Sequence, residues 1–270
     1  MSKSESNTGE PTRTDQSDGE DSAVTAVVEP AQIEPVLTAV ESVVSECRLH
    51  FEQDGLRVVA ADPAHVALVT VELDAAAFER YDAHGTTVGI DVERFGDLVG
   101  MADDDQPISL ALDRETWTLD VTLGGIAYTM ALLDPESVQR PPDRSEMDFP
   151  YEARLEIESG RIDRFVRAVG MVADYVEIGV DPNRPALVVS GEGDTDEVSF
   201  VSGEDELLEL SPGDVRSLFS LGYVSEVSRA IPNGTAVSLR LGDDCPVRFG
   251  YEIADGDGEV EVLVSPRIQR

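Results

Sequence analysis

Residues 55–69 read GLRVVAADPAHVALV, and this stretch contains two strand patterns separated by a turn. Apolar side chains dominate Leu56–Ala61 and, after Asp62 and Pro63, resume over Val66–Leu73. Short runs rich in valine and bounded by turn residues are typical of β-strands. Four further strand patterns follow in the first half of the chain: Thr87–Ile90, Ile108–Leu112, Trp117–Leu123 and Ile126–Leu133.

Apolar residues at spacings of three and four predict four amphipathic helices. They are expected over residues 32–46, 91–102, 161–173 and 220–230. Pro35 would lie in the first turn of the first helix, where a proline is tolerated. One offset of 129 residues maps the first pair of helix starts onto the second pair. The sequence therefore predicts an internal duplication and an α+β fold, with two helices on one face of antiparallel sheet in each half.

A proline-rich stretch separates the two halves. Residues 134–150 contain four prolines and lack usable periodicity, which is typical of a connector. Residues 1–22 have too little apolar surface to offset the entropy of ordering them, and we expect a disordered acidic tail. The predicted organisation is thus a tail, a first domain over 23–133, a connector and a second domain over 151–270.

The charge balance is strongly acidic. Lys and Arg total 20 against 55 Asp and Glu, for a formal charge of −35, and Lys3 is the only lysine. This composition excludes an ordinary basic nucleic-acid-binding domain, so any contact with DNA would need local segregation of charge. It indicates adaptation to a salt-rich cytoplasm, where a Debye length of about 3 Å in molar salt screens self-repulsion. General solubility is the alternative explanation.

Neither an enzyme nor a metal protein is predicted. The two cysteines lie nearly 200 residues apart, the three histidines lie in different elements, and there is no Gly-x-Ser-x-Gly or P-loop motif. The run Asp255–Glu259 lacks the spacing of a calcium loop and is interpreted as a tight acidic turn. There is no secretion signal and no apolar run of 18 residues. We therefore expect a cytoplasmic protein without cofactor, metal or membrane span.

Four strings in this order resemble the archaeal and eukaryotic sliding clamp, the proliferating cell nuclear antigen family. They are residues 55–69, LLDPES at 132–137, PVRFGYEIA at 246–254 and SPRI at 265–268. The resemblance covers about Val24 to Ile268. It implies that three two-domain subunits close into a ring, with sheets outside and helices lining a hole around duplex DNA. It also implies that the ring has no catalysis of its own and needs a clamp loader to tether DNA polymerase and other client proteins.

The resemblance also implies three sets of site residues. Arginines facing the DNA would be Arg94, Arg161, Arg164, Arg167 and Arg229. A pocket for client peptides would use His65, Val66, Leu68, Val138, Pro246, Leu263, Ser265 and Pro266. Two exposed strand edges, near Ile126–Leu132 and Asp196–Val201, are expected to pair head to tail between subunits. The interface would then contain Ile126, Tyr128, Met130, Leu132, Val198 and Phe200.

Two features keep an alternative open. The family usually begins almost directly with its first strand, so the tail is extra, and Ser265 stands where the family commonly has alanine. A divergent paralogue with the clamp fold could bind client peptides as an acidic scaffold without encircling DNA.

Overall fold

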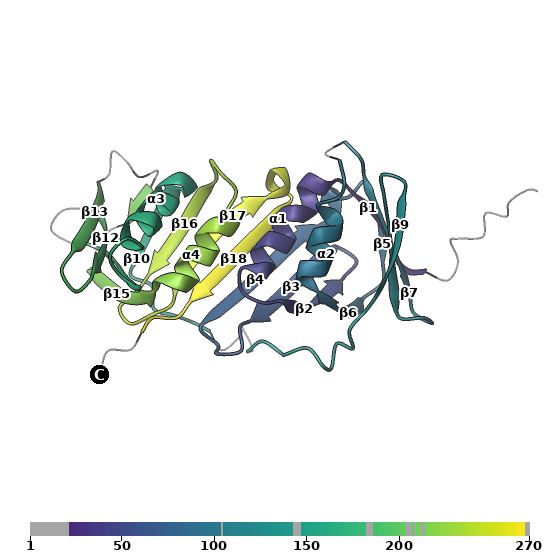
Figure 1. Ribbon diagram of the computed structural model, residues 1–270, viewed down its shortest axis with the longest axis horizontal. Coiled ribbons are helices and arrows are strands. Elements are labelled where there is room, and N and C mark those ends of the chain that lie inside the picture. Colours follow the sequence, from purple (N-terminus) through teal and green to yellow (C-terminus); the bar gives the residue numbers. More distant parts are fainter. Residues whose placement is uncertain are drawn as a thin grey trace, which may run out of the picture.

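Four α-helices lie in a row over one face of a long antiparallel sheet (Figure 1). The computed structural model describes residues 22–267 apart from 104, 143–146, 182–185, 204–206, 208 and 212–213, so residues 1–21 of the expected tail lie outside it. Helix starts in the two halves differ by the predicted offset of 129 residues, which confirms the duplication. Within the described residues the helices are α1 (Pro30–Glu41), α2 (Val92–Val99), α3 (Ser159–Val169) and α4 (Leu221–Ala230).

The sheet beneath the helices contains strands from both halves of the chain. Its nine strands run in the order β14-β10-β16-β17-β18-β4-β3-β2-β6. The halves join where β18 pairs with β4 through seven residue pairs, from Gly258 opposite Leu73 to Val264 opposite Ala67. The first-half strands are β2 (Glu46–Phe51), β3 (Gly55–Ala61), β4 (Ala67–Asp74) and β6 (Thr86–Asp91). The second-half strands are β10 (Ala153–Glu158), β14 (Glu209–Ser211), β16 (Ala236–Leu241), β17 (Val247–Ile253) and β18 (Gly258–Val264).

A smaller sheet closes each end of the molecule (Figure 1). The first has the order β5-β1-β7-β8-β9, and the second has the order β13-β12-β11-β15. β9 and β13 are therefore edge strands. The first sheet contains β1 (Ser22–Val28), β5 (Arg80–Ala83), β7 (Ile108–Asp113), β8 (Thr118–Leu123) and β9 (Ile126–Ala131). The second contains β11 (Tyr175–Val180), β12 (Ala186–Glu192), β13 (Glu197–Gly203) and β15 (Val215–Ser220).

The first helix differs most from its prediction. It begins at Pro30, the favoured first position for proline, and ends at Glu41. Pro35 therefore lies inside the helix rather than in its first turn. Residues 46–51 alternate between outward and buried side chains as β2, so Glu46 belongs to a strand and not to the helix. β2 and β5 were not recognised from the sequence because they are short or merge with neighbouring patterns.

One continuous hydrophobic core lies between the helices and the sheets. Phe95 of α2 and Phe165 of α3 are about 1% and 0% exposed. A separate small cluster lies on the opposite face of the central sheet, where Ala61, Leu68 and Leu263 pack against other apolar side chains. Because alternate residues of a strand face opposite sides, these three point away from the helices.

Candidate functional site

An apolar pocket lies on the face of the central sheet that the helices leave open, and we call it the outer pocket. Its cavity volume is about 60 Å³. Strands β3, β4 and β18 supply its floor, and the loop between β3 and β4 supplies one wall. The outer pocket is lined by Ala61, His65, Val66, Ala67, Leu68, Pro142, Met147, Phe149, Pro246, Leu263 and Ser265. Six of the eight predicted residues are among them, and Val138 and Pro266 are not.

The loop wall is held in shape by the buried carboxylate of Asp62. Its oxygens accept hydrogen bonds from the backbone N–H groups of Val66 and Ala67, both at 2.7 Å, and of Ala64 at 3.0 Å. The hydroxyl of Tyr223 on α4 donates a fourth, at 3.0 Å. Burial by itself raises the pKa of Asp62, but these four hydrogen bonds together hold the pKa below its usual value.

The connector forms the second wall, although with residues that the sequence analysis did not select. Met147 and Phe149 pack against the floor of the outer pocket. Val138 does not line the outer pocket but lies beside Gly89 of β6, where an added Cβ would come within 3.0 Å of it. The Val138 carbonyl accepts a hydrogen bond from Arg48 at 2.6 Å. No periodic pattern singles out Met147 or Phe149 because the connector is neither helix nor strand.

The five predicted arginines on the helices divide into two groups. Arg164, Arg167 and Arg229 are exposed on α3 and α4. Arg167 forms an ion pair with Asp163 at 2.7 Å, and Arg229 forms one with Glu226. Arg164 has no ion pair within the described part of the chain. The exposed carboxylates of α1, which include Glu34 and Glu41, lie on the same layer of helices.

The other two arginines contact the edge strands instead. Arg94 donates to the hydroxyl of Tyr128 on β9 and lies over its ring, 5.6 Å from the centroid. Arg161 donates to the hydroxyl oxygen of Ser202 on β13 at 3.0 Å. These two guanidinium groups therefore support the two ends of the subunit, a role that their position on helices does not reveal in the sequence.

The edge strands each carry partly exposed apolar side chains. Ile126 of β9 is 42% exposed and Val201 of β13 is 40% exposed, while Tyr128, Val198 and Phe200 are half-buried. Phe200 also contacts Phe165 of α3, with ring centroids 6.0 Å apart. Two predicted interface residues, Met130 and Leu132, have buried side chains that belong to the hydrophobic core of this chain.

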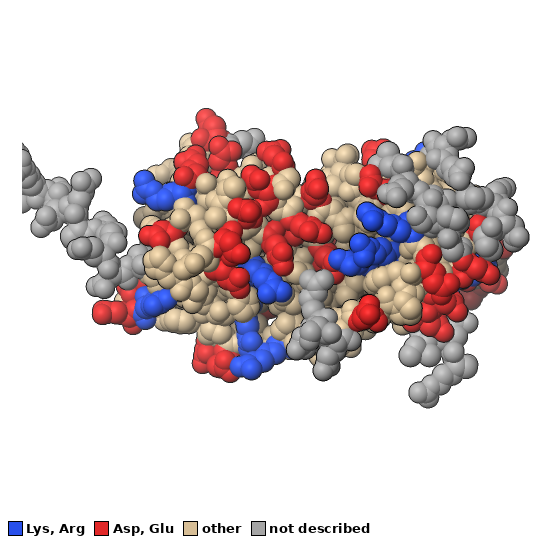
Figure 2. All heavy atoms as spheres, turned by 180° about the vertical axis from the view of Figure 1, so that it is seen from behind, with Lys and Arg blue, Asp and Glu red and all other residues tan. Residues whose placement is uncertain are grey.

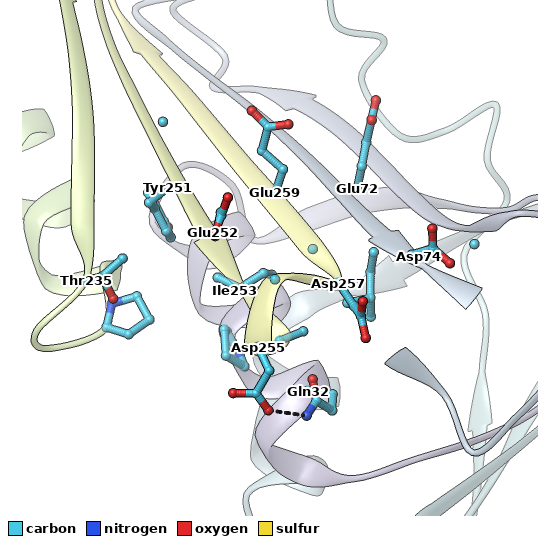
Figure 3. A pocket seen from close by; sticks show the side chains of 18 of the residues that line it. Gln32, Glu72, Asp74, Thr235, Tyr251, Glu252, Ile253, Asp255, Asp257 and Glu259 are labelled. Carbon is cyan, nitrogen blue, oxygen red and sulfur yellow. Dashed lines mark hydrogen bonds between the residues drawn. The ribbon is translucent and has the colours of Figure 1, made fainter. Parts of the chain in front are cut away.

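A broad groove of about 1380 Å³ also lies on the outer face. At its end beside α1, Gln32 donates to the carboxylate of Asp255 at 3.4 Å (Figure 3). Asp255 lies in the turn that joins β17 to β18, which confirms the interpretation of this run as a tight acidic turn. The described residues contain no cluster of side chains arranged to hold a metal ion. The carboxylates around this end are Glu72, Asp74, Glu252, Asp255, Asp257 and Glu259.

The chain also matches known proteins over most of its length. Residues 25–124 match the family model described as proliferating cell nuclear antigen, N-terminal domain. Over 244 residues the chain is 41% identical to the DNA polymerase sliding clamps of Natronomonas pharaonis and Haloarcula marismortui. Each alignment covers 90% of this chain and 98% of the relative. The chain belongs to the DNA polymerase sliding clamp family.

Solved clamps have the same fold. The structure described as the C-terminal region of FEN-1 bound to A. fulgidus PCNA has a TM-score of 0.84 and 29% identity, and the match covers 92% of this chain and 99% of that one. The PCNA of Thermococcus kodakaraensis, at 23% identity and a TM-score of 0.81, agrees in fold. The duplicated clamp fold is therefore confirmed, and a clamp function is favoured over the non-encircling scaffold. The haloarchaeal relatives also support adaptation to salt.

Proposed function

We propose that three copies of this clamp form a closed ring around duplex DNA. The observation that carries this proposal is the pair of open edges at opposite ends of one subunit, β9 and β13. Head-to-tail pairing of two different edges closes a ring when each subunit turns by a third of a circle. An unpaired edge with apolar side chains invites association, and here each subunit would cover the exposed edge of the next.

The layer of four helices would then line the hole. Arg164, Arg167 and Arg229 would face the DNA among many carboxylates, so the ring would hold DNA by enclosing it rather than by affinity. Phosphate contacts weaken steeply with salt, by about 0.9 log units per contact for each log unit of salt. A threaded ring does not depend on such contacts, and this suits an acidic protein adapted to molar salt.

The outer pocket would receive client peptides, including those of DNA polymerase and of a clamp loader. Apolar burial would supply the affinity. The clamp would have no catalysis and would act in the cytoplasm by holding clients at high effective concentration on DNA.

Residues 23–133 and 151–270 would be its two domains, joined by the connector. The described helices are all too short or too polar to span a bilayer.

Two measurements test this proposal. Light scattering in about 2 M KCl should give a particle of about three times the subunit mass of 29.1 kDa. Clamp loaded on a nicked circle should be lost when the circle is linearised, because a threaded ring slides off free ends. The ring would be refuted if the protein is a monomer at high concentration, or if the clamp stays on the DNA after the circle is linearised.

A further inference from the structure

Three arginines form a row on the outer face, and we call them the arginine row. Arg154 of β10 lies directly opposite Arg240 of β16, and Arg240 lies directly opposite Arg248 of β17. Residues directly opposite one another in adjacent strands point to the same face. Their chain neighbours Leu155, Leu239 and Phe249 are all 0% exposed beneath the helices. The arginine row therefore faces away from the helices. In Figure 2, which shows this face, basic side chains gather right of the centre.

Like charges placed directly opposite in a sheet repel each other, and this chain contains only 20 basic residues against 55 acidic ones. Arg248 forms an ion pair with the buried carboxylate of Glu261. Arg154 is exposed and Arg240 is half-buried, and within the described residues neither forms an ion pair. Glu152, just before β10, and Glu156 within it flank Arg154 along the chain and form no ion pair with it among the described residues. As far as the described residues show, two guanidinium groups are thus available to an anionic partner.

The arginine row leads directly into the outer pocket. Arg248 lies opposite Leu263 of β18, Leu263 lies opposite Leu68 of β4, and Leu68 lies opposite Ala61 of β3. The last three residues form the floor of the outer pocket. Strands in a sheet are about 4.8 Å apart, so Arg240 and Arg154 lie about 10 Å and about 14 Å from Leu263. An extended peptide covers about 3.4 Å per residue and reaches Arg154 within about four or five residues.

We propose that the arginine row selects client peptides that carry acidic residues beside their apolar anchors. This inference rests on the proposed role of the outer pocket in client binding. Carboxylates two to five residues from the anchors would contact Arg240 and Arg154, whose planar guanidinium groups suit bidentate pairing. The charges along the broad groove also give the bound peptide a preferred direction. Carboxylates predominate at the far end, around Asp255 and Asp257, and would repel an acidic segment.

Calorimetry with matched peptides tests the proposal. One set carries glutamine, an aliphatic anchor and paired aromatics with Asp or Glu on the amino-terminal or the carboxy-terminal side, and a second set carries Ser at the same positions. For the full chain at about 0.2 M KCl, one acidic version should bind about three- to tenfold more tightly than its Ser version. The preference should shrink but persist at about 2 M KCl, because salt screens partly buried contact pairs much less than it screens separated surface charges.

The double variant Arg154→Gln/Arg240→Gln should remove the preference and leave the affinity for the Ser peptides unchanged. Arg57→Gln is the matched control. It removes a positive charge from the same face, but Arg57 is already paired with Glu72 at 3.4 Å. This variant should keep the preference for acidic peptides. Equal binding of acidic and Ser peptides to the wild type would overturn the inference and leave the client pocket standing. Failure of every peptide to bind would overturn both.

A nucleic acid is the competing occupant. We expect a short single-stranded oligonucleotide to displace the acidic peptide and the Ser peptide equally well. Selective displacement that disappears in Arg154→Gln/Arg240→Gln would assign the arginine row to phosphates and overturn the inference.

Discussion

Tyr223 and Asp62, which are 161 positions apart in the sequence, are joined by a hydrogen bond of 3.0 Å between hydroxyl and carboxylate. Tyr223 belongs to α4 in the layer of helices, and Asp62 shapes the loop wall of the outer pocket. The bond therefore links the second half of the chain to the first, and the helix face to the outer face.

Tyr223→Phe should weaken the clamp at this link. The change removes one of four donors to a buried carboxylate, which costs on the order of 1 kcal/mol of unfolding free energy. Because the loop wall loses a support, peptide affinity at the outer pocket should fall a few-fold. Chemical unfolding and calorimetry would measure the two effects. Tyr81→Phe is a control: the Tyr81 hydroxyl donates to the Gly55 carbonyl at 2.7 Å, remote from the pocket, so only stability should change.

Acid should weaken the same loop. The folded-state pKa of Asp62 lies below its usual value, so its contribution to stability is complete above the unfolded value of about 3.9 and is lost as pH falls through the folded pKa. Asp62→Asn should be less stable than the wild type at pH 7. The difference should narrow below about pH 4, as shown by unfolding curves recorded at fixed high salt. A difference that does not change with pH would contradict this role of the carboxylate.

Charges placed on the strand edges should separate the subunits. Ile126→Asp and Val201→Asp alter side chains that are 42% and 40% exposed, so each subunit should still fold. Each would bury an unpaired carboxylate in the proposed interface and shift the mass toward that of a monomer. Met171→Asp is the matched control, because Met171 is 85% exposed beyond the end of α3. Two edge variants that remain trimeric at low micromolar concentration would show that the interface lies elsewhere.

A side chain at Gly89 should displace the start of the connector. A Cβ there would lie 2.9 Å from the Cβ and the carbonyl oxygen of Leu133 and 3.0 Å from a methyl of Val138. Gly89→Val should therefore break the backbone pairing of Gly89 with Leu133 and increase amide exchange after residue 133. Gly96→Ala on α2 meets nothing within 4 Å and should leave exchange there unchanged.

Reversing the exposed arginines should shorten the time on DNA. Arg164→Glu, Arg167→Glu and Arg229→Glu together would place nine carboxylates in a trimeric hole where nine cations stood. Retention of loaded clamp on circular DNA should drop, while trimer mass and peptide affinity stay constant. Retention that is lost on linearisation but unaffected by the variant would leave the ring intact and reassign only the residues that face the DNA.

Sequence reasoning succeeded where a pattern is local and repeated. Apolar spacing located all four helices to within a few residues, and their offset indicated the duplication. It failed where residues that meet in space lie far apart along the chain. The arginine row exists only through the register of β10, β16 and β17, and Arg94 meets Tyr128 across 34 positions. Val138 was selected by its place in the connector, whereas the turn of the chain brings Met147 and Phe149 to the outer pocket instead.

The pairing of β18 with β4 has a consequence for synthesis of the chain. β4 ends at Asp74 and its partner begins at Gly258, so one of its edges stays open while the intervening residues are made. At about 5 to 20 residues per second this delay lasts roughly 10 to 40 s. Contacts between segments so distant in sequence form slowly. The nascent first half must therefore remain soluble with an unpaired valine-rich strand, and the abundant carboxylates, which hold water and keep a chain of high net charge soluble, suit it to that interval.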